Sequence, residues 1–364
     1  PAKASFIMHA AIMCHYAEGG FYPMGGGGAL VKAMTNKIKA YKGVIKTSTA
    51  VNRILIEGEK HKKAIGVELA SGEKIFADRV ISNADPDTTY LNLIGQEHLS
   101  KKLLNKLSKT KYSCTSLMLF LTVDMDVKKA GLDSGNIWRI PNKDLDTINA
   151  DMQKVDILEG EEFSGMFISC TSLKDPISFD GRYHTIEAIT YINYDAFAEF
   201  KDEAIERTPK YLEFKEQIIQ KYLVTLEKVI PGITANIVHK DLGTPMTNEY
   251  YLNTTRGNVY GTEKSLKHIG PFAYKSKSEI ENMYMCGASI VSHGVAGAGY
   301  SGVQTAGAIL GRRQDDLLSL EKDQDLRIFE AEDDSNYPEW MTKKIEVKKA
   351  RLTSGVDAFA KGEK

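Results

Sequence analysis

One segment constrains this chain more than any other: a short apolar strand that runs into a stretch of small residues and then into a helix. Residues 282–287 predict the strand, residues 288–301 the small-residue loop and residues 302–313 the helix. Small side chains let a flat or anionic ligand approach the backbone closely, and the start of a helix offers free N–H groups. The segment predicts a cofactor-binding turn or, as the alternative, only a tight connection between a strand and a helix packed against it.

A second glycine segment has the same design. Gly25–Gly28 precede apolar residues with helical spacing at positions 30, 31, 34 and 38, and the alternative for this segment is a flexible connector. Neither segment matches the G-x-G-x-x-G or G-x-x-x-x-G-K-[ST] fingerprints. Between residues 43 and 84 the pattern changes to short β-rich runs separated by turn signals, which predict a small antiparallel meander ending in a more buried strand. Together these parts indicate a large cofactor-binding α/β domain.

The charge balance and the cysteines exclude several classes of protein. There are 47 Lys and Arg residues against 48 Asp and Glu, so bulk electrostatics predict no nucleic-acid partner. The four cysteines lie far apart and form no CxxC or Cys/His spacing, so we expect no metal site and no disulfide framework. The most apolar stretch, Leu117–Val123, is too short to span a bilayer, and the chain begins without a visible signal peptide. These features predict a cytoplasmic protein, with peripheral association with a membrane left open.

Five segments, in this order, resemble a family of flavoproteins that includes phytoene desaturase, carotenoid isomerase and retinol saturase. The resemblance covers roughly residues 19–311. The segments are Tyr22–Gly27, Thr49–Ile54, Ala77–Pro86, Gly257–Gly261 and Met285–Val303. The resemblance implies the FAD-binding, doubly wound α/β domain of the amine-oxidase superfamily with an inserted α+β substrate domain. It also implies hydride exchange between FAD and a polyene or another apolar substrate.

The resemblance also implies a division of the chain and a set of cofactor-binding residues. Residues 1–18 would form a helix of the substrate domain, 19–95 and 246–311 the FAD-binding domain, 96–245 the substrate domain and 312–364 a charged tail. Gly25, Gly26 and Gly27 would lie along the flavin, Val51 would meet the adenine, and Asn83 and Ala84 would end a strand near the cofactor. Gly287 and Ala288 would approach the pyrophosphate and ribityl chain, and Gly297, Ser301, Gly302 and Val303 would lie under the isoalloxazine.

Two departures from the family pattern stand out. Many relatives carry an acidic residue where this chain has Ala288, which removes a contact to the ribityl chain. The N-terminal strand, its G-x-G-x-x-G turn and the acidic ribose-binding residue have no counterpart here, so the chain resembles the C-terminal two-thirds or so of a complete protein. We therefore expect a chain truncated at its N-terminus that binds FAD poorly, or not at all, by itself.

The sequence identifies no general acid or base, but two side chains are candidates for a catalytic role. His293 is a candidate proton donor beside the flavin, and a hydrogen-bonded structural histidine is the alternative. Tyr300 is a candidate for facing the ring or the substrate, and a packing aromatic is the alternative. The predicted function is FAD-dependent desaturation, saturation or isomerisation of a carotenoid or retinoid. Two other functions stay open: a non-catalytic lipid-binding protein of the GDP-dissociation-inhibitor type, and a flavin-dependent amine or protoporphyrinogen oxidase.

Overall fold

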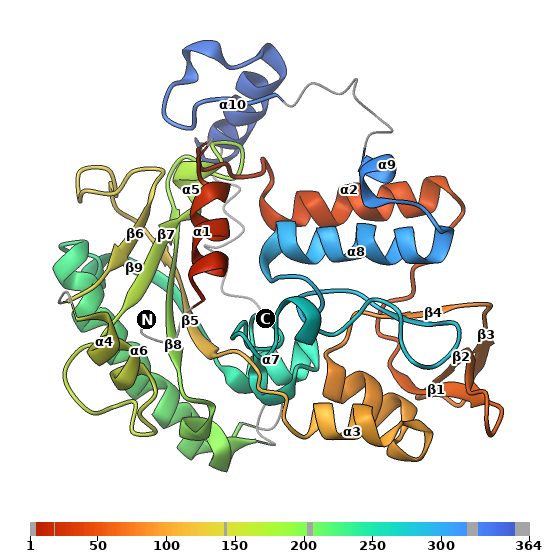
Figure 1. The fold of residues 1–364 in the computed structure, drawn as a ribbon. Coiled ribbons are helices and arrows are strands. Elements are labelled where there is room, and N and C mark those ends of the chain that lie inside the picture. The colour runs from red at the N-terminus through yellow and green to blue at the C-terminus, as the bar shows by residue number, and fades with distance from the viewer. Residues whose placement is uncertain (1–4, 18, 142–143, 202–206, 319–326, 354–364) are drawn as a thin grey trace. The chain divides into compact units, whose positions relative to one another are not determined.

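The fold is that of a computed structural model, which describes residues 5–17, 19–141, 144–201, 207–318 and 327–353. The chain, whose helices and strands are labelled in Figure 1, divides into two compact units. Unit 1 comprises Pro1–His15, Lys46–Thr115 and Pro245–Asp325, and unit 2 comprises Tyr16–Ile45, Ser116–Thr244 and Leu326–Lys364. No helix of the described residues is long and apolar enough to cross a membrane.

Unit 1 contains two small sheets and the helical segments around them. Its strands are β1 (Val51–Glu57), β2 (Lys63–Leu69), β3 (Lys74–Phe76), β4 (Val80–Ser82) and β10 (Met283–Met285). Its helical segments are α1 (Phe6–His15), η1 (Asp87–Ile94), η2 (Gln96–His98), α3 (Lys101–Leu107), α7 (Pro245–Leu252), η5 (Thr255–Gly257), η6 (Gly270–Phe272), α8 (Gly294–Leu310) and α9 (Gln314–Leu318). The sheet β1-β2-β3 is the predicted antiparallel meander, whereas β4 leaves it and pairs in parallel with β10.

The core of unit 1 lies under these strands. Ile54 of β1, Ala64 of β2, Val80 of β4 and Met283 of β10 are all buried in one apolar cluster. Tyr90 and Ile94 of η1 complete that cluster from the helical side. The cluster joins segments more than 180 residues apart, so it fixes β4 and β10 side by side in spite of their short length.

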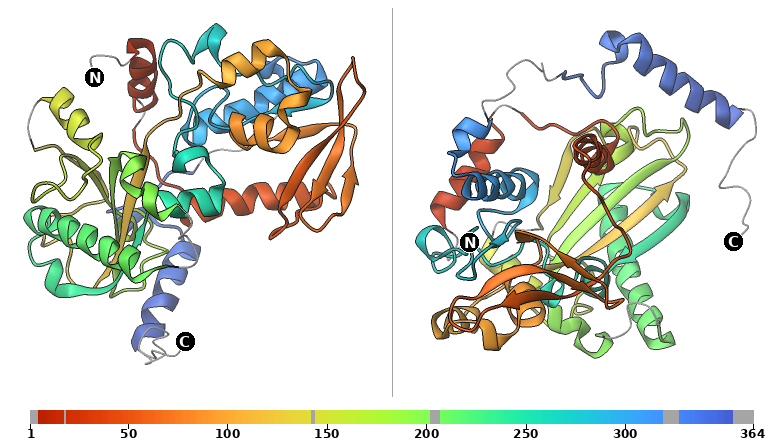
Figure 2. Two further views of the ribbon diagram at one scale, coloured as in Figure 1. Left: turned by 90° about the horizontal axis from the view of Figure 1, so that it is seen from below. Right: turned by 90° about the vertical axis from the view of Figure 1, so that its right-hand side faces the viewer.

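Unit 2 is built on a five-stranded sheet in the order β6-β7-β8-β5-β9 (Figure 2). The strands are β5 (Thr115–Val123), β6 (Asn136–Arg139), β7 (Met166–Cys170), β8 (His184–Ile192) and β9 (Ile237–Gly243). The helical segments are α2 (Gly26–Ala40), α4 (Leu145–Met152), α5 (Thr171–Lys174), η3 (Tyr194–Phe200), α6 (Pro209–Val229), η4 (Thr234–Asn236), η7 (Asp334–Asn336) and α10 (Glu339–Thr353). Alternate residues of β8 from His184 to Ile192 are buried, which is the period-2 pattern of a strand with one covered face.

Helix α6 covers one face of that sheet. Thr208 caps the helix by accepting a hydrogen bond from the backbone N–H of Tyr211, and Pro209 occupies the first helical position. Tyr222 is fully buried, and its hydroxyl donates to the carbonyl of Leu117 on β5 at 3.0 Å. The helix is therefore held to the sheet by a buried hydrogen bond as well as by apolar packing.

Several expected element boundaries are wrong. The spacing of apolar residues over 195–229 predicts one long helix, whereas the structure has two segments there, η3 and α6; residues 202–206 lie outside the described residues. Residues 44–45 belong to no strand. The loop predicted over 288–301 ends at His293, because α8 begins at Gly294 rather than at residue 302. The many glycines predict a loop, but small residues are also compatible with a helix that packs closely against its neighbours. Within the charged tail expected over 312–364, the described residues include the helices α9 and α10.

Candidate cofactor site

The parallel pair of β4 and β10 brings two loops to the same edge of unit 1. Val80 lies opposite Met283, and Ser82 opposite Met285. The backbone N–H of Cys286 donates to the carbonyl of Ser82 at 2.9 Å, which continues the ladder by one residue. Because the strands are parallel, the segments that follow them, starting at residues 83 and 286, leave the sheet together.

Gly287 forms the first turn after β10. Its φ is 96°, in the left-handed region, and an added Cβ would clash with the side-chain oxygen of Asn83. Its backbone N–H donates to the hydroxyl of Ser301 at 2.7 Å, and that hydroxyl donates to the carbonyl of Ala298 at 2.6 Å. The structure thus brings Asn83, Gly287 and Ser301 together, three of the residues expected at the cofactor.

Helix α8 presents an open backbone near its start. Gly294, the first residue of the helix, has a φ of 76°, and a Cβ added at Gly294, Gly299 or Gly302 would meet no atom within 4 Å. Gly297 differs, because its Cβ would lie 2.7 Å from Ser292. The expectation that Gly297, Ser301, Gly302 and Val303 mark a loop and a helix start is therefore corrected, since all four lie inside α8. The first turn of a helix has backbone N–H groups without partners inside the helix.

A turn from another part of the chain braces the loop after β10. The backbone N–H of Thr262 donates to the hydroxyl of Ser289 at 3.2 Å, and a Cβ at Gly261 would lie 2.6 Å from that hydroxyl. The Nζ of Lys264 donates to the carbonyl of Ala288 at 2.6 Å. The segment that follows Gly257–Gly261 therefore holds Ala288 and Ser289 in place.

Two basic side chains beside this loop have lowered pKa values. Burial lowers the pKa of Lys264 to about 8. Burial and then the charge of Lys264 lower the pKa of His293, so this imidazole is neutral at pH 7. The ring of Tyr260 lies 4.6 Å from that of His293, centre to centre, and the Nδ1 atom of His293 is buried without a hydrogen-bond partner. Such an unpaired buried atom is a position that a bound group can satisfy.

Asp85 ties the segment after β4 to the segment before Gly257. The carboxylate is buried and accepts from the backbone N–H of Thr88 at 2.9 Å. It also accepts from the backbone N–H and the hydroxyl of Thr255, at 2.6 Å and 3.1 Å. Arg256 and Gly257, which follow, both have positive φ. Asp85 therefore fixes a backbone conformation that few residues adopt by themselves.

The remaining predicted residues lie elsewhere. Ala84 follows β4 and donates its N–H to the hydroxyl of Ser82 at 3.2 Å, and Val51 begins β1 with an exposed side chain. Gly25, Gly26 and Gly27 belong to unit 2, where the N–H of Gly25 donates to buried Asp175 at 2.8 Å. Gly25 and Gly26 have positive φ, and α2 begins at Gly26. Tyr300, on α8, is 41% exposed and so is available to a ligand.

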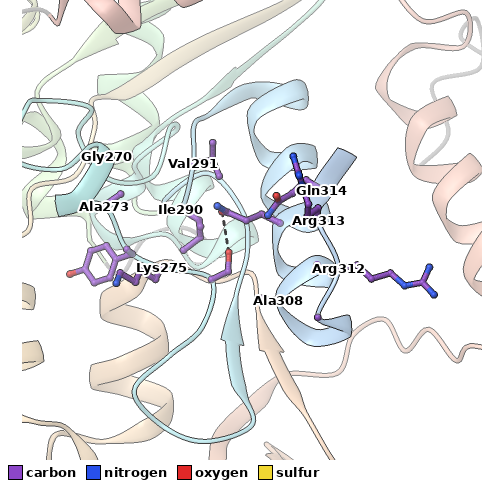
Figure 3. A pocket seen from close by; sticks show the side chains of 14 residues that line it. Gly270, Ala273, Lys275, Ile290, Val291, Ala308, Arg312, Arg313 and Gln314 are labelled. Carbon is purple, nitrogen blue, oxygen red and sulfur yellow. Dashed lines mark hydrogen bonds between the residues drawn. The ribbon is translucent and has the colours of Figure 1, made fainter. Parts of the chain in front are cut away.

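A hollow of about 800 Å³ opens beside α8 (Figure 3). Its walls are the turn from Gly270 to Ser276, then Ile290 and Val291, and the C-terminal half of α8. Arg312 and Arg313 lie beyond the end of that helix. The described residues that line it include none of the expected cofactor-binding residues. The hollow is therefore separate from the candidate cofactor site.

Sequence reasoning missed the residues that brace the site. Lys264 and Thr262 follow the Gly257–Gly261 segment, and nothing in their local pattern distinguishes them from a solvated turn. Asp85 follows Asn83 and Ala84 within the segment that carries the resemblance, yet its role as a buried acceptor depends on Thr255, 170 residues away. One signal was available: Asp85 lies within Ala77–Pro86, and Thr262 and Lys264 follow Gly257–Gly261, and both of these segments carry the family resemblance.

Comparison with known proteins supplies relatives of this chain. No model of a protein family matches it. It is 29% identical over 322 residues to all-trans-retinol 13,14-reductase of Danio rerio, which covers 85% of this chain and 52% of that protein. It is 26% identical over 311 residues to the chloroplastic prolycopene isomerase of Daucus carota, covering 84% of this chain and 46% of the isomerase. The chain therefore spans about half the length of the curated relatives it matches. The predicted resemblance is confirmed.

Solved structures agree on the fold. An oxidoreductase from Methanosarcina mazei superposes with a TM-score of 0.51 at 17% identity, over 80% of this chain and 55% of that chain. Putrescine oxidase bound to putrescine gives a TM-score of 0.52 at 14% identity, over 79% and 54% of the respective chains. At these identities the likeness concerns the fold alone, and it confirms a mixed α/β architecture found in oxidoreductases.

Proposed function

We propose that this chain is part of an FAD-dependent oxidoreductase that acts on carbon–carbon bonds of an apolar polyene. The observation that carries the proposal is the similarity, over 84–85% of the chain, to both a retinol reductase and a prolycopene isomerase. One of these names describes a reduction and the other an isomerisation, and both concern conjugated chains. The shared requirement is a redox cofactor held against an apolar substrate.

The candidate cofactor site fits a dinucleotide with a flat ring. The open backbone at Gly294, Gly299 and Gly302 leaves room for a group to approach α8 closely. The orphaned Nδ1 of His293 offers a hydrogen-bonding atom. In this proposal Gly287, Ala288 and the start of α8 hold the phosphate and ribityl parts. Gly25–Gly27, Val51, Asn83, Ala84, Gly297, Ser301, Gly302 and Val303 keep their proposed roles at the cofactor.

When bound, FAD supplies a ring that exchanges a hydride with the substrate. The residues of this chain supply orientation and charge. Ser301 fixes the Gly287 turn, and Lys264 fixes the carbonyl of Ala288. The lowered pKa leaves the His293 ring neutral at pH 7, so it can accept a proton and return it from the protonated form. Tyr300 and Val295, both exposed on α8, offer apolar surface to a substrate.

The finer architecture belongs to the same proposal. We place residues 19–95 and 246–311 in a doubly wound FAD-binding domain without its N-terminal βαβ unit, and residues 96–245, which carry the five-stranded sheet of unit 2, in an inserted substrate domain. The support is the parallel pairing of β4 with β10, because a parallel pair usually belongs to a larger sheet that is covered by helices on both faces. Cytoplasmic location and peripheral association with a membrane stay predictions.

The test is to express the complete open reading frame that contains this sequence and to record its visible spectrum after purification. A bound-flavin band is expected, together with anaerobic turnover of all-trans-retinol or prolycopene followed by chromatography of the products. Replacing Gly302 by Trp should abolish the band while the protein stays folded by circular dichroism. A folded protein that takes up no added FAD would refute the proposal and favour the lipid-binding alternative. Flavin that is reduced by an amine, and not reoxidised by a polyene, would favour the amine-oxidase alternative.

A further inference from the structure

Lys264 is a partly buried cation without an acidic partner. Its Nζ donates to the carbonyl of Ala288 at 2.6 Å and lies 3.5 Å from the hydroxyl of Thr262. Among the described residues it forms no ion pair, and the neighbouring Glu263 lies 3.8 Å from His268 instead. Burying an uncompensated charge costs free energy, and an opposite charge that binds beside it offsets part of that cost.

The start of α8 adds a positive potential next to Lys264. His293 interacts electrostatically with Lys264 and precedes the first turn of α8, whose unpaired N–H groups carry partial positive charge. The ring of Tyr260 packs on His293, and burial raises the pKa of Cys286, so that thiol is neutral at pH 7. No carboxylate contributes to the shift of the Lys264 pKa. At pH 7 the Lys264 ammonium and the start of α8 therefore give this part of the loop a positive potential.

We propose that Lys264 sets the charge preference of this site, so that a negatively charged group binds at the His293 end of α8 in preference to a neutral one. The amide and hydroxyl contacts of Ser301, Ser289 and Thr262 position the loop, but they are neutral and cannot make that distinction. This inference rests on the proposed function in one respect: if the ligand is FAD, Lys264 favours its reduced, more negative form over its oxidised form.

The first experiment tests the charge without any cofactor. The imidazole of His293 is titrated by NMR in the wild type, in Lys264→Gln and in Lys264→Arg, with Lys267→Gln as a matched loss of an exposed lysine three residues away. The pKa of His293 should rise in Lys264→Gln and stay low in the other two variants, because only the first removes the nearby positive charge. If Lys264→Gln does not fold, Lys264→Met replaces it, since that side chain keeps an apolar stem. An unchanged His293 pKa in the neutral variant overturns the proposal.

The second experiment uses the complete protein with FAD. Dissociation constants for oxidised and dithionite-reduced FAD are measured anaerobically by ultrafiltration. In Lys264→Gln the preference for reduced FAD should fall about tenfold, as expected for loss of a unit charge at short range, and it should stay within twofold in Lys267→Gln. An unchanged ratio in Lys264→Gln overturns the proposal. If the wild type binds neither form, the proposed function fails, and the histidine titration alone decides the role of Lys264.

Discussion

The hydroxyl of Ser301, inside α8, accepts a hydrogen bond at 2.7 Å from the backbone N–H of Gly287, fourteen residues earlier. The same hydroxyl donates to the carbonyl of Ala298, and the side chain is fully buried. A single side chain thus connects the turn after β10 with the helix that follows it. This hydrogen bond holds the turn against α8 and so restrains the loop between them.

Ser301→Ala should lower the free energy of unfolding by about 1 to 3 kcal/mol, because it leaves the buried N–H of Gly287 without an acceptor. Urea denaturation followed by circular dichroism measures this change. Ser108→Ala is the control, since that exposed hydroxyl donates only to the carbonyl of Asn105 at the end of α3. If both variants lose the same small amount, the Ser301 contact carries no special weight.

Gly287→Ala should destabilise the chain by about 1 to 2 kcal/mol, because its φ of 96° is unfavourable for any residue with a Cβ. Part of the cost comes from Asn83, whose side chain must turn away, so Asn83→Ala combined with Gly287→Ala should recover only part of the loss. The matched control is Gly299→Ala, in the middle of α8 with open space at its Cβ. That change should stabilise the helix by up to about 1 kcal/mol. Equal losses at both glycines would contradict the conformational argument.

Asp85→Ala should be the most destabilising of these changes, at about 3 kcal/mol, because the carboxylate accepts hydrogen bonds from Thr88 and from two atoms of Thr255. Asp85→Asn should cost less, since its single amide oxygen can still accept from one of the two backbone N–H groups, that of Thr88 or that of Thr255. Thermal unfolding compares both with Asp78→Ala, an exposed carboxylate that should change stability by less than about 0.5 kcal/mol. A loss below 1 kcal/mol for Asp85→Ala would show that the segment at Thr255 is held by other contacts.

The sequence predicted the elements whose pattern is local. The alternating burial of β8 and the turn signals between β1 and β2 follow from spacing that any window of ten residues displays. The sequence places the start of α8 eight residues too late, because Gly294, Gly297 and Gly299 have low helix propensity. Tertiary packing overrides that preference. Propensity is the weaker effect wherever a helix is held by buried residues such as Ser301.

The candidate site was predictable only in part, for a related reason. Glycines are informative in a sequence because they adopt positive φ angles more readily than other residues. Gly287 has such an angle and lies where a turn is expected. Lys264 and Asp85 gave no such signal, since a lysine or an aspartate in a polar segment is usually solvated. Their burial arises from pairing with Ala288 and Thr255, partners that no local window contains.

Lys264 should also give the chain a pH-dependent stability of defined sign. Its pKa is about 8 in the folded state and near 10.5 in the unfolded state, so between these values the unfolded chain binds more protons. The free energy of unfolding contributed by this group therefore rises from about pH 8 to about pH 10.5, by about 3 kcal/mol, and is constant below pH 8. Tyrosines whose pKa is raised in the fold act in the opposite direction, so the useful quantity is the difference between the wild type and Lys264→Met. Urea midpoints at pH 7, 8, 9 and 10 measure it. Because the lysine ceases to be a buried charge in the fold as the pH rises, Lys264→Met should be the more stable protein at pH 7 and should lose that advantage by pH 10. A difference that does not vary with pH would mean that the ammonium group of Lys264 is solvated in the folded protein.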